Sequence, residues 1–180
     1  MLVLVDMDDV VAQWAEGYDS LLDEHGEAAA AIPRHADRLH WDLRTGRSGV
    51  EKKIIEKVMR EPGFYRFLRA VPGARTALRQ IRDAGHDIRF VSAPYISNPT
   101  CASDKIAWIE RHYGARWAQR VILTTDKTLV RGDVLIDDRP DITGAVEPVW
   151  EHVVFTQPYN AHITDRRRMS SWSEWRNILG

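Results

Sequence analysis

The sequence predicts an α/β protein built on a parallel, doubly wound sheet. Short apolar runs, typical of strands buried on both faces, alternate with segments whose apolar residues recur at helical spacing. The clearest runs end abruptly in polar or acidic residues. Strands that alternate with helices favour a parallel sheet, and such sheets bind ligands outside the carboxyl ends of their strands. We therefore expect these polar strand ends to converge on one rim.

The expected strands lie, in chain order, at residues 2–5, 87–91, 121–123, 134–136 and 152–155. Helical spacing predicts helices at residues 14–22, 74–81, 103–113 and 171–179. Gly85 stands where glycine commonly follows a helix end. Ser103 is the candidate N-cap of the third helix, and Ser171 with Glu174 has capping-box spacing at the fourth.

Residues 27–68 are less regular than the rest of the chain. The stretch begins with an alanine run, turns polar and aromatic, and then carries apolar residues at helical spacing between Val50 and Met59. We interpret it as a small, mainly helical cap inserted after the first helix. The α/β core would then comprise residues 1–26 and 69–180.

Composition narrows the class of function. The chain has 180 residues, of which 44% are hydrophobic and 28% charged, as in ordinary soluble globular proteins. Its formal net charge of -1 offers no basic field for a nucleic-acid polymer, so we expect any nucleotide to bind in a pocket. Cys101 is the single cysteine, which fits a reducing compartment. With no signal peptide or membrane span expected, we predict a cytoplasmic protein.

Polar residues with catalytic potential follow the expected strands. In chain order they are Asp6-Met7-Asp8, Ser92, Lys127 and Asp137-Asp138. Each signal alone is typical of a turn, a cap or a solvated surface. Their common placement at strand ends predicts a joint function.

The first two acids suit the cleavage of a phosphate monoester, which needs a nucleophile and a proton donor for the leaving oxygen. Asp6 can attack phosphorus and form an acyl phosphate. Asp8 lies where the strand gives way to a loop, so it can reach the leaving oxygen as a general acid and then activate water as a base.

The remaining signals supply positive charge. Lys127 offers an ammonium and Ser92 a hydroxyl to phosphate oxygens. A carboxylate nucleophile approaches an anion poorly unless a cation neutralises the site. Asp6 and the pair Asp137-Asp138 offer the hard oxygen ligands that Mg²⁺ prefers, so we predict Mg²⁺ as the cofactor.

This ordered set resembles the haloacid dehalogenase (HAD) superfamily of phosphotransferases, whose motifs are D-x-D, Ser/Thr, Lys and a terminal acidic pair. The resemblance implies that Asp6 is the nucleophile and Asp8 the acid/base. It also implies that Ser92 and Lys127 bind phosphate.

The same resemblance implies the metal ligands. Asp6, the backbone carbonyl of Asp8, and Asp138 would hold Mg²⁺, with Asp137 close by.

Nearly the whole chain is similar to the 5′(3′)-deoxyribonucleotidases. The matching stretches are residues 5–8, 126–128, 135–144, 150–153, 166–168 and 171–172, and the run from Ile136 to Gly144 is specific to that family. The similarity implies that cap aromatics surround the base, with Trp14, Trp41 and Met59 at positions of that pocket. It also implies a nucleoside monophosphate substrate, and we expect uracil or thymine deoxynucleotides to be preferred.

The chain departs from that pattern at four positions. Asp9 stands where the family usually has glycine, and Ala93 where a second hydroxyl often follows the first. These two changes bear on rate and phosphate contacts. Met59 and His40 replace aromatic residues of some relatives, which bears on base preference.

Other interpretations stay open at this point. The chain could act on another small phosphomonoester, or bind a nucleotide without catalysis. A receiver-type signalling domain also forms a phospho-aspartate, but its acidic pair comes at the first strand, whereas here the pair comes last. A homodimer is possible, and the sequence decides neither ribose against deoxyribose nor the 5′ against the 3′ phosphate.

Overall fold

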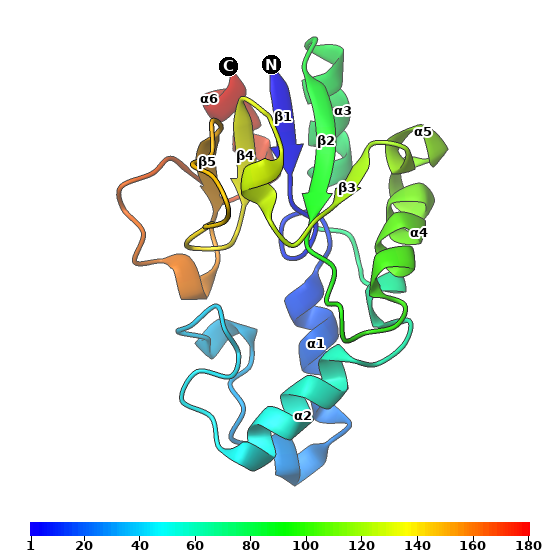
Figure 1. The fold of residues 1–180 in the computed structure, drawn as a ribbon, viewed down its shortest axis with the longest axis vertical. Coiled ribbons are helices and arrows are strands. Elements are labelled where there is room, and N and C mark those ends of the chain that lie inside the picture. The colour runs from blue at the N-terminus through cyan, green and yellow to red at the C-terminus, as the bar shows by residue number, and fades with distance from the viewer.

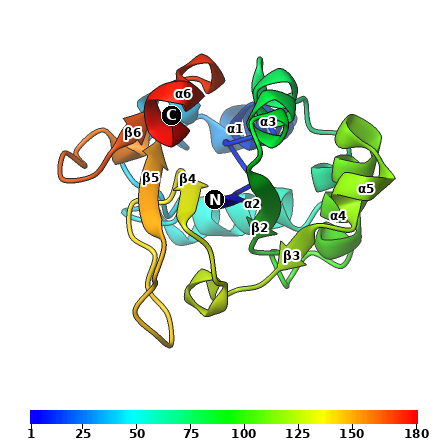
Figure 2. The same ribbon diagram turned by 90° about the horizontal axis from the view of Figure 1, so that it is seen from above.

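The computed structural model describes all 180 residues and contains a six-stranded parallel sheet (Figures 1 and 2). The strands are β1 Leu2–Val5, β2 Asp87–Ser92, β3 Val121–Leu123, β4 Val134–Asp137, β5 Glu151–Phe155 and β6 Arg168–Met169. Their order is β3-β2-β1-β4-β5-β6, and all neighbours run parallel. The predicted sheet and its expected strands are confirmed. Strand β6 was missed because two residues carry no recognisable period.

Both faces of the sheet are buried, as the apolar runs predicted. Successive side chains of a strand point to opposite faces. Accordingly Val3 and Val5 of β1 belong to the large core, while Leu4 between them packs in a smaller cluster with Leu135 and Trp150. Strand β1 is therefore packed on both of its faces, directly before the first acidic residues.

Helices α3 Ala74–Asp83 and α6 Trp175–Leu179 lie side by side on one face of the sheet (Figure 2). Helices α4 Cys101–Tyr113 and α5 Ala115–Ala118 lie at the β3 end. Gly85 follows α3 with φ of 91°, a left-handed conformation that suits glycine, so the predicted helix end is confirmed. The longest helix, α4, has 13 residues, and no helix could cross a membrane.

Two predicted helix starts are wrong. Helix α4 begins after Thr100, and Ser103 lies inside its first turn, where its hydroxyl donates to the Thr100 carbonyl. Ser171 makes no cap hydrogen bond, and it precedes a 3₁₀ turn at Trp172–Glu174. The carboxylate of Glu174 accepts a hydrogen bond from the backbone of Ser170 instead, which prevents the expected capping box.

Helices α1 Trp14–Asp23 and α2 Gly49–Met59 pack together beyond the carboxyl ends of the strands (Figure 1). Helix α2 begins with a capping box, in which the Ser48 hydroxyl accepts from the Glu51 amide and the Glu51 carboxylate accepts from the Ser48 amide. Short 3₁₀ turns at Gly26–Ala29, His35–Asp37 and Phe64–Arg66 complete the segment. These two helices and the turns face the rim where the polar strand ends meet.

Candidate active site

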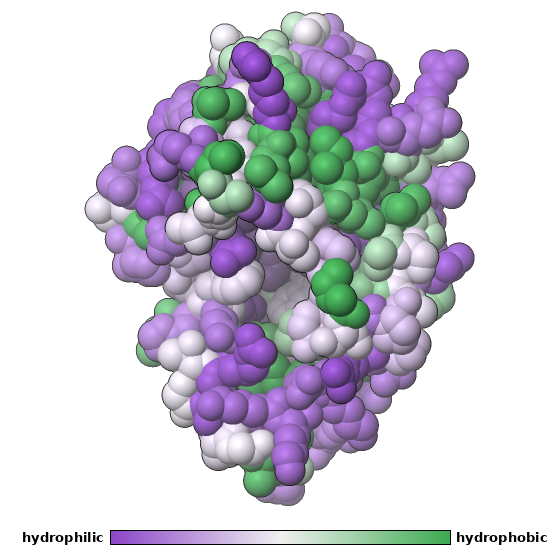
Figure 3. All heavy atoms as spheres, in the orientation of Figure 1, coloured by the Kyte–Doolittle hydropathy of each residue, from purple (hydrophilic) through white to green (hydrophobic).

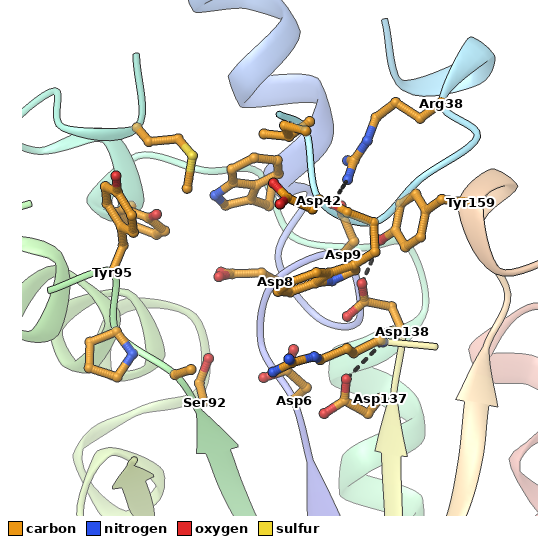
Figure 4. A pocket seen from close by; sticks show the side chains of 18 of the residues that line it. Asp6, Asp8, Asp9, Arg38, Asp42, Ser92, Tyr95, Asp137, Asp138 and Tyr159 are labelled. Carbon is orange, nitrogen blue, oxygen red and sulfur yellow. Dashed lines mark hydrogen bonds between the residues drawn. The ribbon is translucent and has the colours of Figure 1, made fainter. Parts of the chain in front are cut away.

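The polar strand ends meet at one edge of the sheet because β1 lies between β2 and β4 (Figure 4). A cavity of about 270 Å³ opens there between the strand ends and residues 38–59, at the hollow in the middle of the face shown in Figure 3. All the residues predicted from sequence line it, namely Asp6, Asp8, Trp14, Trp41, Met59, Ser92, Lys127, Asp137 and Asp138. The sheet topology therefore brings the expected catalytic groups and the expected base pocket together.

Lys127 lies at the centre of the acidic group. It opens a 3₁₀ turn, Lys127–Leu129, just after β3. Its ammonium contacts Asp6 at 2.7 Å and Asp137 at 2.5 Å, and all three side chains are buried. Burial would raise the pKa of Asp6, but the charges of Lys127 and Lys105 outweigh it and hold that pKa below its usual value. Asp6 is therefore kept ionised, as a nucleophile must be.

Asp8 has the opposite tendency although it lies two residues further on. Burial raises its pKa against the opposing charge of Lys105. Titratable groups whose environments push their pKa values apart can serve as base or nucleophile on one side and acid on the other. The structure thus places Asp6 and Asp8 in environments that shift their pKa values in opposite directions.

Lys105 is a site residue that sequence reasoning missed. It projects from α4, is 1% exposed, and donates to Asp8 at 2.6 Å and to the Ser92 hydroxyl at 2.9 Å. A signal was present, because Lys105 lies on the same helical face as Cys101 and Trp108, which are buried. A lysine on the apolar face of a helix needs a buried partner, and here the partner is the first acidic motif.

Oxygen atoms of Asp6, Asp137 and Asp138 lie within 4.8 Å of one another and could hold a metal ion. Burial raises the pKa of Asp138 well above its usual value, and repulsion by Asp137 adds to this effect. A cation among these acids would relieve both costs. The donors are hard carboxylate oxygens, so the residues present fit Mg²⁺.

Asp138 is held in place by two residues after β5. Tyr159 donates its hydroxyl to the Asp138 carboxylate at 2.5 Å, and the Asn160 side chain donates to the Asp138 carbonyl at 2.7 Å. Both belong to the 3₁₀ turn Pro158–Asn160 and are buried. No periodicity marks this turn, so sequence reasoning could not assign its residues to the site.

Asp9 occupies a left-handed conformation, with φ of 54°, and is the one non-glycine residue with positive φ. This geometry suits glycine, the residue that the resemblance implies at this position. Asp is among the few other residues that tolerate it. The Asp9 carboxylate accepts a hydrogen bond from the Ala15 amide at the start of α1, at 2.8 Å, and burial raises its pKa to about 7.

Aromatic residues line the same cavity as the acids. Trp14 is nearly buried and stacks on Tyr18 at 5.0 Å, whereas Trp41 is 43% exposed. The guanidinium of Arg139 lies 4.4 Å from the centre of the Trp41 ring. Met59 lies at the end of α2 and also lines the cavity. Flat apolar faces are thus available within the same cavity as the acids.

The fold is that of the HAD-like hydrolases. A magnesium-bound structure from Bacillus subtilis, provisionally named a HAD hydrolase, matches with a TM-score of 0.61, covering 99% of this chain and 98% of that one at 10% identity. A structure from Clostridium acetobutylicum, provisionally named a phosphatase, matches with a TM-score of 0.59 at 15% identity, covering 99% and 97%. At these identities the likeness concerns the fold.

The family follows from the sequence comparisons. The profile described as 5′ nucleotidase, deoxy (pyrimidine), cytosolic type C protein (NT5C) matches residues 1–179. The human cytosolic 5′(3′)-deoxyribonucleotidase is 36% identical, covering 98% of this chain and 92% of its own. A Bordetella bronchiseptica protein provisionally named a 5′(3′)-deoxyribonucleotidase is 41% identical, covering 99% and 95%. The chain belongs to this nucleotidase family, and it is a phosphoric monoester hydrolase. Membership of this family excludes the interpretation as a receiver-type signalling domain.

Proposed function

We propose that the protein hydrolyses deoxyribonucleoside monophosphates through a phospho-aspartate on Asp6. The observation that carries the proposal is that Asp6 lines the same cavity as the aromatic residues Trp14 and Trp41. The ionised nucleophile contacts Lys127, and the proton donor Asp8 is two residues away. A phosphate and a flat nucleoside can therefore be bound in one cavity.

The reaction has two displacements. A carboxylate oxygen of Asp6 attacks phosphorus while the bond from phosphorus to the ester oxygen breaks, and Asp8 gives its proton to that leaving oxygen. Asp8 then takes a proton from water, whose oxygen attacks the phosphorus of the acyl phosphate. The bond between Asp6 and phosphorus breaks, and inorganic phosphate leaves. Both carboxyl groups return to their starting states.

Two donors that line the cavity are placed to bind the phosphate oxygens. Lys127 brings an ammonium group, and Ser92 brings a hydroxyl from the end of β2. Ala93 follows Ser92 and lines the cavity without a hydroxyl of its own. Lys105 is buried behind Ser92 and Asp8, so it adds positive charge through its hydrogen bonds to them.

Mg²⁺ is the cofactor that we propose. Asp6, Asp138 and the backbone carbonyl of Asp8 would hold it, with Asp137 bonded to Lys127 close by. When bound it would offset the negative charge of the phosphoryl group. The acidic cluster supports this assignment, as does the magnesium bound by the Bacillus subtilis protein of the same fold.

The stereochemistry at phosphorus tests the covalent mechanism. Two successive in-line displacements should release phosphate with retained configuration when an isotopically chiral phosphorothioate ester is cleaved. Direct attack by water would invert it. Inversion would overturn the phospho-aspartate on Asp6 while leaving the phosphatase activity intact.

The substrate is tested by comparing kcat/KM across 5′ and 3′ ribo- and deoxyribonucleotides, sugar phosphates and a small aryl phosphate. We expect deoxynucleotides with uracil or thymine to lead. Base stacking on an aromatic side chain is worth roughly 1–3 kcal/mol. Trp14→Ala or Trp41→Ala should therefore lower kcat/KM about tenfold or more for nucleotides, and much less for the aryl phosphate. A sugar phosphate that equals every nucleotide would contradict the nucleotidase assignment.

Residues 27–68 are proposed to act as a cap that excludes water from the cavity. Because α1 packs on α2, we expect α1 to move together with residues 27–68 if the cap opens or closes. A cytoplasmic location and a homodimer remain predictions. The human relative's name contains the words cytosolic type, and other relatives are named mitochondrial.

A further inference from the structure

Arg38 is a buried cation that the proposed reaction does not use. It follows the 3₁₀ turn His35–Asp37, lines the cavity and is 5% exposed. One terminal nitrogen, Nη2, donates to the Trp41 carbonyl at 2.9 Å. Its Nε and Nη1 atoms are buried without a hydrogen-bond partner. Burying a charged group this way is costly unless something else compensates it.

Aromatic faces provide that compensation. The Arg38 guanidinium lies 4.3 Å from the centre of the Tyr159 ring and 5.9 Å from that of Trp14. Cations gain most from aromatic faces when both are desolvated, as here. Tyr159 in turn donates its hydroxyl to Asp138, and Figure 4 shows Arg38, Tyr159 and Asp138 in succession down one side of the cavity.

A second arginine, Arg139 of the α/β core, contacts an aromatic ring near Arg38. Arg139 directly follows Asp138, and its backbone amide donates to Asp137 at 2.9 Å. Its guanidinium lies over the ring of Trp41, which belongs to the same segment as Arg38. The segment 35–41 thus places an arginine on a tyrosine of the α/β core, while the core places an arginine on a tryptophan of that segment.

We propose that Arg38 is a positioning residue that holds Trp41 against the cavity. Arg38 and Arg139, with their partners Tyr159 and Trp41, form what we term the arginine clasp. Arg38 fixes the backbone of Trp41, and Arg139 fixes its ring. This inference rests on the proposed function, because it assigns Trp41 to contact with the nucleoside.

The clasp requires guanidinium groups. A planar guanidinium can stack on a ring and donate in its own plane at the same time, whereas a lysine ammonium cannot do both. Trp41 needs such support because the residue is 43% exposed and a free indole would sample several rotamers. Loss of the clasp should therefore lower selectivity for nucleotides more than it lowers the chemical step.

The test measures kcat/KM for deoxyuridine 5′-monophosphate and for 4-nitrophenyl phosphate, and takes their ratio. Arg38→Gln should lower this ratio about tenfold, and Arg38→Lys should restore only a small part of it. Arg60→Gln is the matched control, because Arg60 also lies within residues 27–68 but pairs with Glu56 at the surface. In a Trp41→Ala background, Arg38→Gln should change the ratio less than twofold, since residues that act through one another are not additive.

Two results would overturn the clasp. One is an Arg38→Gln effect that persists undiminished in the Trp41→Ala background. The other is an equal loss for both substrates. If Arg38→Gln fails to fold, Arg139→Gln with the same Trp41→Ala background decides in the same way.

Amide hydrogen exchange separates this proposal from the proposed function. Residues 38–44 should exchange faster in Arg38→Gln and in Arg139→Gln, without any substrate present. If the wild type prefers the aryl phosphate over every nucleotide, the nucleotidase proposal fails, and the hydrogen-exchange rates become the only test of the arginine clasp. Unchanged exchange in both variants would then overturn the clasp, and faster exchange would support it.

Discussion

Replacing Lys105 with methionine is the sharpest test of how the site holds its charge. Methionine keeps most of the apolar stem but removes the ammonium that bonds Asp8 at 2.6 Å and Ser92 at 2.9 Å. Removing one preorganised donor from a buried site typically costs about 10²–10³ in rate. We therefore expect kcat/KM to fall by about two to three orders of magnitude, or roughly 2.7–4 kcal/mol.

The same variant should also destabilise the fold moderately. Breaking a buried ion pair by removing one partner costs about 3–5 kcal/mol when the remaining charge stays buried. The Asp8 side chain is 28% exposed and can take up a proton, so we expect a smaller loss of about 2 kcal/mol. Denaturant unfolding at neutral pH measures this loss, and Lys53→Met on the exposed side of α2 is the control.

The pH profile of kcat/KM for Lys105→Met should also shift in a defined direction. Burial raises the pKa of Asp8, and Lys105 opposes that rise. Without Lys105 the pKa of Asp8 should rise further, so the general acid stays protonated to higher pH and the alkaline fall of kcat/KM moves upward. A variant within threefold of wild-type activity, or an alkaline limb that moves downward, would refute this account of the site.

Three further outcomes are expected. Asp6→Asn should abolish phosphate release while leaving the fold intact, and residual turnover above about 1% would contradict its role as nucleophile. Chelation should remove activity, and Mg²⁺ should restore it. Ca²⁺ should bind yet support turnover poorly, because it prefers more ligands at longer distances. Full activity in excess chelator would exclude the metal. Gly144→Ala should lower kcat/KM, because a Cβ atom there would collide with the Asp126 carboxylate that caps the turn carrying Lys127. Equal activity of Gly144→Ala and wild type would show that this turn does not depend on Asp126.

The strand-end residues could be predicted because a parallel sheet imposes where they lie. Once Asp6, Ser92 and Asp137 are placed after buried strands, the topology rule brings them to one rim. Lys127 belongs to the same rim by the same rule. The run from Ile136 to Gly144 pointed to the family, and its last glycine now has a physical reason in its contact with Asp126.

Residues outside the strand ends could not be predicted in this way. Lys105 lies within a helix, where only its position on the buried face gave a signal. Arg38 and Tyr159 come from irregular segments, and nothing in their local sequence says that they will stack on each other. The helix start at Thr100 was missed because serine, threonine and asparagine candidates crowd the loop before α4. Long-range packing, which has no local period, decided these positions.

The different chemistry of Asp6 and Asp8 arises from this long-range packing. Both acids come from one short motif, so local sequence alone would give them similar pKa values. Lys127 arrives from beyond β3 and brings the pKa of Asp6 below its usual value. Lys105 arrives from α4 and bonds Asp8, yet burial still keeps the pKa of Asp8 raised. The sheet order and one helix face thus set the opposite pKa shifts on which the proposed roles of Asp6 as nucleophile and Asp8 as proton carrier rest.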